Sequence, residues 1–283
     1  MKKIIDIIVP IRNEENNIPV FVENINCLKS NKLCSLQIIF VEDGSFDGTK
    51  RVLRKIVKGN NNIKYYCLKK GYGQGAAISF GIYKSNADAV IMMDIDESHP
   101  TEVIPVMVEH YINGFDIVQG VRNHIKDRKF YRNFGSKVFG KIFRLIINDG
   151  FTDYFRLISK SIAKELVKNN KFQHTIRFNK GIMKGYKQTK VIFSSSDRVI
   201  GQSKYDFFRL ARFGLDVILS VISKRRLFLL MTMYLIIGLV IYNYSQVFVL
   251  AIFFIPALFL LLRYIQISTT NLIDKCMVIE KGA

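Results

Sequence analysis

Residues 36–49 read LQIIFVEDGSFDGT, an apolar run that passes directly into acids, glycines and hydroxyl residues. The run Leu36–Val41 is rich in β-branched side chains, which is typical of a strand buried on both faces of a sheet. The residues that follow are those that form turns, and a helix is expected near residues 48–58. This stretch is therefore predicted to be one strand–turn–helix unit.

The same unit recurs on both sides of this stretch, throughout residues 1–120. Apolar runs predict strands at Ile4–Val9, Leu36–Val41, Ile63–Leu68, Ala89–Met93 and Asp116–Gln119. Helical patterns lie near residues 17–28, 48–58, 75–85 and 101–112. Buried strands that alternate with helices indicate an α/β fold with a doubly wound, mostly parallel sheet. Ligands bind to such sheets beyond the carboxyl ends of the strands.

Four consecutive strand ends carry acids, glycines and amides. The four segments are PIRNEEN (10–16), EDGSFDGT (42–49), KKGYGQG (69–75) and DIDESHP (94–100). This clustering predicts a nucleotide site, although the second segment alone could be two turns. Gly71, Gly73 and Gly75 follow the third strand and do not fit GxGxxG, so a Rossmann dinucleotide site is not indicated. These glycines either let the backbone approach a ligand or begin a helix.

Asp94 and Asp96 place two carboxylates directly after the fourth strand. Hard oxygen ligands of this kind suit Mg²⁺ or Mn²⁺, which could meet a diphosphate there. A plain turn can produce the same pair. His99 is expected to be a local hydrogen-bonding residue and not a ligand.

The chain of 283 residues has a formal net charge of +19, from 42 Lys and Arg against 23 Asp and Glu. Residues 101–226 alone contribute +15, from 25 basic and 10 acidic residues. Such a charge suggests nucleic acid or anionic membrane lipids as a partner. No nucleic-acid-binding motif is recognisable, which favours the lipids. The cysteines form no CxxC pair, so neither a disulfide framework nor a zinc site is indicated.

Between Arg226 and Arg263 the chain has 36 residues without a charge. Two transmembrane helices are expected here, Leu227–Tyr244 and Val247–Tyr264, because one helix of this length would exceed the hydrocarbon core of about 30 Å. Basic residues flank both ends, which predicts that both termini are cytoplasmic. The abundance of Lys, Ile and Asn suggests a bacterial source, and hence a bacterial inner or plasma membrane. The alternative is a buried helical hairpin of a soluble protein. Tyr205–Ile222 is expected to be a helix in the membrane interface, or otherwise a core helix.

Taken in order, these segments resemble glycosyltransferase family 2, and within it the polyprenyl-phosphate glycosyltransferases, the group of dolichol-phosphate mannose synthase and its bacterial undecaprenyl-phosphate relatives. The resemblance covers about residues 4–222. The residues that carry it are VPIRNEENN (9–17), VEDGSFDGT (41–49), KKGYGQGAA (69–77), MDIDESHP (93–100), FRLISK (155–160) and RVIGQSKY (198–205).

The resemblance implies a GT-A fold that binds a UDP- or GDP-linked sugar and a polyprenyl phosphate. It places Pro10, Arg12 and Glu14 around the base of the donor, and Glu42 and Asp43 near the base and ribose. Gly73 and Gly75 are further donor-binding candidates. Asp94 and Asp96 would hold Mg²⁺ or Mn²⁺ on the diphosphate. The resemblance assigns contacts with the lipid phosphate to Arg122, Arg132 and Ser136, and a loop closing over the substrates to Arg198, Ser203 and Lys204.

The sequence departs from the family pattern at three points. Glu42 stands where the family often has aspartate. Glu97 and Ser98 replace the Leu-Gln that commonly follows the two metal-binding aspartates, so Glu97, Ser98 or water would complete the metal shell. Asp153 and Tyr154 precede the Phe-Arg-Leu segment in place of the usual Gly-Asp or Ser-Gly.

Four parts are expected along the chain: a cytoplasmic catalytic domain (1–204), an interfacial helix (205–226), two transmembrane helices (227–267) and a cytoplasmic tail (268–283). The expected activity is inverting transfer of a sugar to a polyprenyl phosphate, and a homo-oligomer is left open. One alternative is transfer to a sugar hydroxyl, with Asp149 or Asp153 as the base. The other is a non-enzymatic basic membrane-binding module. The basic residues within Phe130–Ile147 could face lipid headgroups on an amphipathic helix.

Overall fold

The computed structural model describes residues 2–28, 34–123, 154–168, 185–194 and 278–282, together with short helical pieces between residues 228 and 265. The chain divides into two compact units. The first unit comprises residues 1–202 and 272–283, and the second comprises residues 203–271. The fold described below is that of the first unit.

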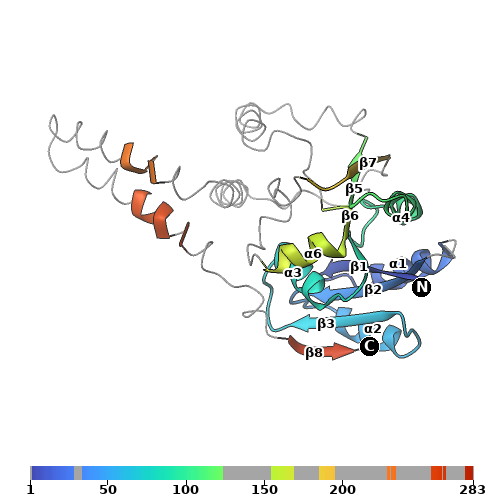
Figure 1. Cartoon of the computed structure of the whole chain (residues 1–283). Coiled ribbons are helices and arrows are strands. Elements are labelled where there is room, and N and C mark those ends of the chain that lie inside the picture. The colour runs from blue at the N-terminus through green and yellow to red at the C-terminus, as the bar shows by residue number, and fades with distance from the viewer. Residues whose placement is uncertain are drawn as a thin grey trace, which may run out of the picture. The chain divides into compact units, whose positions relative to one another are not determined.

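The first unit is built on an eight-stranded mixed sheet (Figure 1). Its strands lie in the order β7-β5-β6-β4-β1-β2-β3-β8. Strand β6 runs antiparallel between β4 and β5, and β8 runs antiparallel to β3. The strands are β1 (Lys3–Ile11), β2 (Cys34–Glu42), β3 (Ile63–Leu68), β4 (Ala89–Met92), β5 (Ile117–Arg122), β6 (Arg156–Ser159), β7 (Gln188–Phe193) and β8 (Val278–Gly282).

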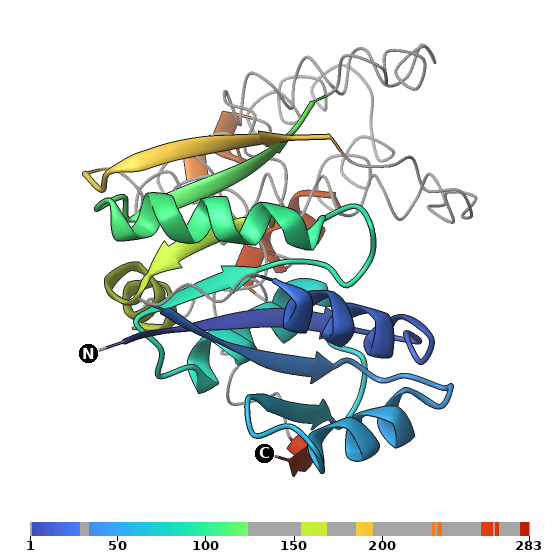
Figure 2. The same ribbon diagram turned by 90° about the vertical axis from the view of Figure 1, so that its right-hand side faces the viewer.

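Helices cover both faces of the sheet. The helices are α1 (Asn17–Cys27), α2 (Thr49–Val57), α3 (Gln74–Lys84), α4 (Ile104–Ile112) after the 3₁₀ turn η1 (Thr101–Val103), and α6 (Lys160–Lys168). One apolar core includes side chains of α1, α2 and α4, and the other includes side chains of α3 and α6. Figure 2 shows α1 and α4, in blue and green, in front of the strands. The central strand β1 is buried on both faces, which explains its unbroken apolar run.

The predicted strands and helices of residues 1–120 are confirmed, with ends that shift by at most three residues. The mostly parallel sheet is confirmed only in part, because β6 and β8 make it mixed. The first 120 residues supply β1 to β4 and the start of β5. Strands β1 to β4 pair in parallel because a helix connects each of them to the next. Strands β6, β7 and β8 were not predicted. They come from later segments, whose apolar runs are short.

No helix within the described ranges is long and apolar enough to cross a membrane. The expected helices Phe130–Ile147 and Tyr205–Ile222 lie outside these ranges, as do most residues of the two expected spans. Those four segments stay predictions. Among the described cysteines, Cys27, Cys34 and Cys67 are free thiols, as the spacing indicates.

Candidate active site

A cavity of about 260 Å³ opens at the carboxyl ends of β1, β2 and β4, beside the first residue of α3. This is the edge at which an α/β sheet binds its ligands. Acidic groups, a glycine and one arginine dominate the lining. The lining residues are Pro10, Ile11, Arg12, Glu14, Asp43, Gly73, Gln74, Asp94, Ile95 and Asp96.

The loop after β1 and the loop after β2 are joined by hydrogen bonds in both directions. The amide of Asn13 donates to Ser45 Oγ at 3.0 Å, and the amide of Phe46 donates to Asn13 Oδ1 at 2.8 Å. Asn13 has a φ of 58°, a left-handed conformation that asparagine tolerates better than most residues. This arrangement fixes the flanking residues Arg12 and Glu14 at the cavity.

Glu42 is fully buried at the end of β2. Its Oε1 accepts the amide of Ser45, and its Oε2 lies 3.6 Å from Lys50 Nζ. The carboxylate thus supports its own turn and does not line the cavity. The expected place of Glu42 beside the base and ribose therefore remains a prediction.

Asp43 connects the turn after β2 to the loop after β3. One carboxylate oxygen accepts the amide of Tyr72 at 2.6 Å, and the other accepts the amide of Gly73 at 2.8 Å. Burial raises the pKa of Asp43 above its usual value, although these two amides and the charge of Arg12 oppose the shift. A carboxylate that accepts two amides holds the loop 69–73 in a single position.

Glycines allow the turn after β2 and the loop after β3 to lie close together. Gly44 has a φ of +75°, and a Cβ at this position would lie 2.6 Å from the Gly71 amide nitrogen. Gly73, at φ +96°, lines the cavity and immediately precedes α3. The expected helix start is confirmed at Gly73, whereas the approach of this backbone to a ligand stays a prediction. Gly75 lies within α3 and is not among the lining residues.

The two aspartates after β4 are held by neighbouring side chains. Gln74 donates through Nε2 to Asp94 Oδ1, and the amide of Asp94 donates to His99 Nδ1 at 2.6 Å. Ser98 donates through its amide, at 3.1 Å, and through its hydroxyl to Asp96 Oδ1. The prediction that His99 is a local hydrogen-bonding residue is confirmed. The sequence analysis did not predict that Gln74 orients Asp94. The only indication in the sequence was a polar side chain directly after Gly73.

The carboxylates create a negative potential in the cavity. Burial raises the pKa of Glu14, the hydrogen bond from Asn17 lowers it, and the charges of Asp96, Asp47 and Asp94 raise it further. A bound cation would relieve this repulsion. Within the described part of the chain, no group of three or more His, Cys, Asp or Glu side chains is placed to hold a metal.

Asp94 and Asp96 nevertheless fit one class of divalent site. The Asp94 side chain is 27% exposed, and Asp96 lines the same cavity. Mg²⁺ often binds through one or two carboxylates and completes its octahedron with water and substrate phosphates. The two aspartates therefore suit a cation that arrives with a diphosphate better than a stand-alone metal site.

Arg122 lies at the same edge of the sheet as the two aspartates. Arg156 lies opposite both Met92 of β4 and Gln119 of β5, so these three residues are level across the sheet. Arg122 is three residues beyond Gln119 along β5. Strand β6 lies between β5 and β4, so the axes of β5 and β4 are about 10 Å apart.

Arg156, fully buried within the quoted FRLISK segment, was not predicted as a site residue. Arg132, Ser136, Arg198, Ser203 and Lys204 lie outside the described residues.

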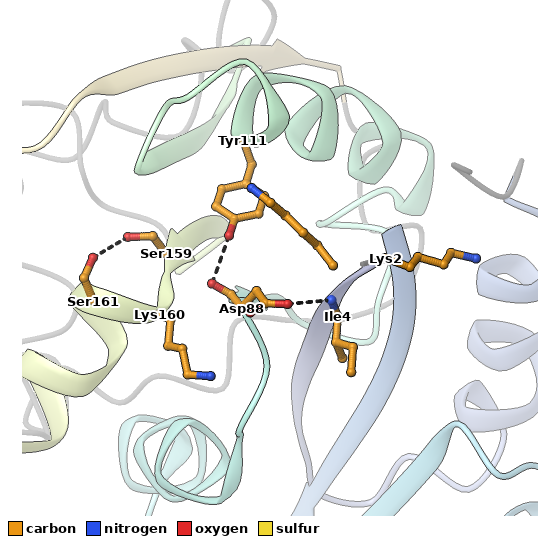
Figure 3. A pocket seen from close by; sticks show the side chains of 8 residues that line it. Lys2, Ile4, Asp88, Tyr111, Ser159, Lys160 and Ser161 are labelled. Carbon is orange, nitrogen blue, oxygen red and sulfur yellow. Dashed lines mark hydrogen bonds between the residues drawn. The ribbon is translucent and has the colours of Figure 1, made fainter. Parts of the chain in front are cut away.

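A second hollow lies at the opposite edge of the sheet, around the amino end of β1 (Figure 3). The Asp88 carboxylate accepts the amide of Ile4 at 2.9 Å, and the Asp88 carbonyl accepts the Tyr111 hydroxyl at 3.0 Å. Ser159 and Ser161 are hydrogen-bonded to each other. Its polar groups thus largely satisfy one another, and its edge is not the ligand-binding edge.

Comparisons with known proteins identify the family of this chain. The family model described as Glycosyl transferase family 2 matches residues 6–191. An uncharacterized glycosyltransferase of Synechocystis sp. is 31% identical over 222 residues, which cover 76% of this chain and 69% of the relative. A bactoprenol glucosyl transferase of Shigella phage SfV is 30% identical over 223 residues, covering 76% and 71%.

A solved structure shares the fold. Glucosyl-3-phosphoglycerate synthase from Mycobacterium tuberculosis, in complex with Mn²⁺, uridine diphosphate and phosphoglyceric acid, superposes with a TM-score of 0.53 at 15% identity. The match covers 77% of each chain and establishes a GT-A-like α/β fold. The resemblance noted from the sequence is thereby confirmed: this chain is a glycosyltransferase and belongs to glycosyltransferase family 2.

Proposed function

We propose that this chain transfers a sugar, with inversion, from a UDP- or GDP-linked donor to a polyprenyl phosphate at the cytoplasmic face of a membrane. The observation that carries the proposal is the arrangement of Asp94, Asp96, Asp43 and Arg12 around one cavity at the carboxyl edge of the sheet. The acceptor is suggested by relatives such as the bactoprenol glucosyl transferase of phage SfV.

On the donor side, each lining group has a separate task. Arg12 and Pro10 line the region proposed for the base, and the loop 69–73 borders the cavity at Gly73. Asp94 and Asp96 would hold Mg²⁺ or Mn²⁺, and that cation would stabilise the leaving nucleoside diphosphate. Gln74 and Ser98 keep the two carboxylates oriented before the donor arrives.

On the acceptor side, a lipid phosphate needs no dedicated base. A phosphomonoester has a second pKa near 6 and is largely ionised at neutral pH. Its oxygen forms the new bond to the anomeric carbon while the bond from that carbon to the diphosphate breaks. The protein must therefore hold the phosphate in line, and Arg122 at the same sheet edge is suited to this task. Arg132 and Ser136 stay proposed partners of the phosphate.

The membrane assignment rests on sequence and on strand pairing. The 36 uncharged residues before Arg263 are proposed to form two spans, preceded by the interfacial helix. Strand β8 joins the same sheet as β1, so the chain on both sides of this segment lies on one side of any membrane. This pairing is compatible with the two proposed spans, because two crossings return the chain to the same side. The +15 charge of residues 101–226 would then face anionic lipid headgroups.

A second candidate acceptor is a sugar hydroxyl. That reaction requires a carboxylate base near the acceptor. Asp149 and Asp153, the residues considered for it, lie outside the described ranges. The chemical lability of the product separates the two cases, because a glycosyl phosphodiester is acid-labile and an ordinary glycoside between sugars is far less so.

The test uses the purified full-length chain with Mg²⁺ or Mn²⁺, undecaprenyl phosphate and a panel of labelled UDP- and GDP-sugars. An acid-labile, lipid-soluble sugar product is the expected result. A product that forms only with a sugar acceptor would favour the second candidate. Folded protein that yields no lipid-linked product with any donor would overturn the proposal. Titrating donor and acceptor separately in Arg122→Ala, with Lys84→Ala as a control elsewhere on the surface, then tests the phosphate contact.

A further inference from the structure

The end of the chain returns to the catalytic sheet. Strand β8 pairs antiparallel with β3, in a register that runs from Tyr65 opposite Gly282 to Leu68 opposite Val278. More than 200 residues separate the two strands in sequence, and β8 is the outermost strand on this side of the sheet (Figure 1). The sequence analysis assigned these residues to a cytoplasmic tail and predicted no strand there.

The partner of β8 leads directly into the donor cavity. Leu68 ends β3, and the loop 69–73 that follows supplies the amides of Tyr72 and Gly73 to the Asp43 carboxylate. A Cβ on Gly71 would lie 3.2 Å from Arg12 Nη1, so the same loop also borders that arginine.

The residue after this loop reaches the metal-binding pair. Gln74, the first residue of α3, donates to Asp94 Oδ1. One continuous segment, residues 65–74, therefore connects β8 with Arg12, Asp43 and Asp94, three residues proposed to contact the donor.

Without β8, β3 would be an edge strand. Its outward amides and carbonyls would lose their partners, and a strand at the edge of a sheet opens locally at a lower free-energy cost than a strand paired on both sides. The β3 end that is paired by β8, Cys67 and Leu68, is also the end from which the loop departs. Fraying there would release the loop that Asp43 binds.

We propose that β8 is a positioning element of the donor site: by pairing with β3 it holds the loop 69–73 in the conformation that accepts the nucleotide-sugar. The proposal rests on the proposed function for the identity of the ligand. It makes donor affinity depend on the last residues of the chain, which follow the proposed membrane segment.

Gly282 offers a specific way to disturb the pairing. A Cβ at this position would overlap the Tyr65 ring, which is buried with only 4% of its surface exposed. Gly282→Ala should therefore push β8 away from β3. The adjacent Lys281 is exposed, so Lys281→Ala is a matched control in the same strand. A chain that ends at Met277 removes β8 altogether and serves as the second variant.

The experiment measures two quantities on the unaltered protein and on each variant. The first is the Kd for UDP and for GDP in the presence of Mn²⁺, and the second is hydrogen exchange of the amides in residues 69–75. Gly282→Ala and the shortened chain should weaken nucleotide binding by about tenfold, the scale of one lost hydrogen-bonding contact. Exchange should accelerate in residues 69–75 and stay unchanged in β1 and β4. Lys281→Ala should change neither quantity.

Each other outcome counts against the inference. Folded variants with unchanged nucleotide affinity and unchanged exchange in residues 69–75 would overturn it. Faster exchange spread over the whole sheet, or loss of the fold, would make β8 a general stabiliser and would overturn it too. Failure of the unaltered chain to glycosylate a lipid phosphate would instead contradict the proposed function, because neither measurement here involves the acceptor.

Discussion

The amide nitrogen of Gly73 lies 2.8 Å from Oδ2 of Asp43, so a carboxylate at the end of β2 holds the residue that precedes α3. This bond joins two loop residues that are 30 positions apart in sequence. It makes the shape of the donor cavity depend on a side chain that is itself almost completely buried.

Asp43→Asn should weaken the donor site without unfolding the protein. Asparagine can accept only one of the two amides through its oxygen, and its NH₂ group would face the other donor. We expect the KM for the nucleotide-sugar to rise about tenfold, the scale of one lost hydrogen bond. The melting temperature should change little, because burial raises the pKa of Asp43 and removal of its charge offsets part of the loss. An unchanged KM would show that the loop does not need this carboxylate; Asp116→Asn, at the opposite edge, is the control.

Asp96→Asn should abolish sugar transfer. The variant removes one of two charged oxygen ligands proposed for Mg²⁺ or Mn²⁺, and the leaving diphosphate would lose its stabilisation. Ser98→Ala is the matched variant, because it keeps the Asp96 carboxylate and removes only the hydroxyl that orients it. We expect partial activity there, with weaker Mn²⁺ binding in the presence of UDP. Normal turnover in Asp96→Asn would show that the two aspartates form only a turn.

Gly44→Ala should destabilise the protein. The position has a φ of +75°, and an added Cβ would meet the Gly71 backbone. We expect a loss of about 1–3 kcal/mol in the free energy of unfolding, measured by urea denaturation. Gly59 is exposed and a Cβ there would have no neighbour within 4 Å, so Gly59→Ala should be neutral or slightly stabilising. Equal effects at the two positions would contradict the close approach of the two loops.

Asp6→Asn should make the protein more stable at neutral pH. Burial raises the pKa of Asp6, although hydrogen bonding by Ser85 and the charge of Lys64 oppose the shift. A raised folded-state pKa means that wild-type stability falls as pH rises from the unfolded value, near 3.8, through the folded value. The advantage of the variant should therefore be full above the folded pKa and should shrink as pH is lowered, in melting temperatures measured across pH.

Asp47→Asn should change the stability in the direction opposite to Asp6→Asn. Slight burial would raise the pKa of Asp47, but hydrogen bonds from Thr49 and Glu15 outweigh it, and the pKa is lowered. This carboxylate contributes stability above its unfolded pKa and loses it as pH falls. The variant should be less stable than the wild type at neutral pH. A shift of the same sign in both variants would contradict the different environments of the two carboxylates.

Much of the site could be predicted from residues 4–100. The strands there are buried on both faces, so they read as unbroken apolar runs, and their polar ends must converge on one edge of a parallel sheet. Asp94, Asp43 and Arg12 were identified in this way and do line one cavity. Glu42 was identified by the same argument and points into its own turn, because a strand end does not determine the direction of each side chain.

Sequence alone determined the order of the first strands and helices, the acidic edge of the sheet, and membership of a glycosyltransferase family, because these depend on local periodicity and on motifs within single segments. Only the tertiary structure decided that β6 enters the sheet in the opposite direction, that Gln74 orients Asp94, and that β8 returns to pair with β3. Those features are contacts between segments far apart in the chain. The free energy of such a pairing depends on which edges and side chains the folded chain brings together, and no local pattern records it.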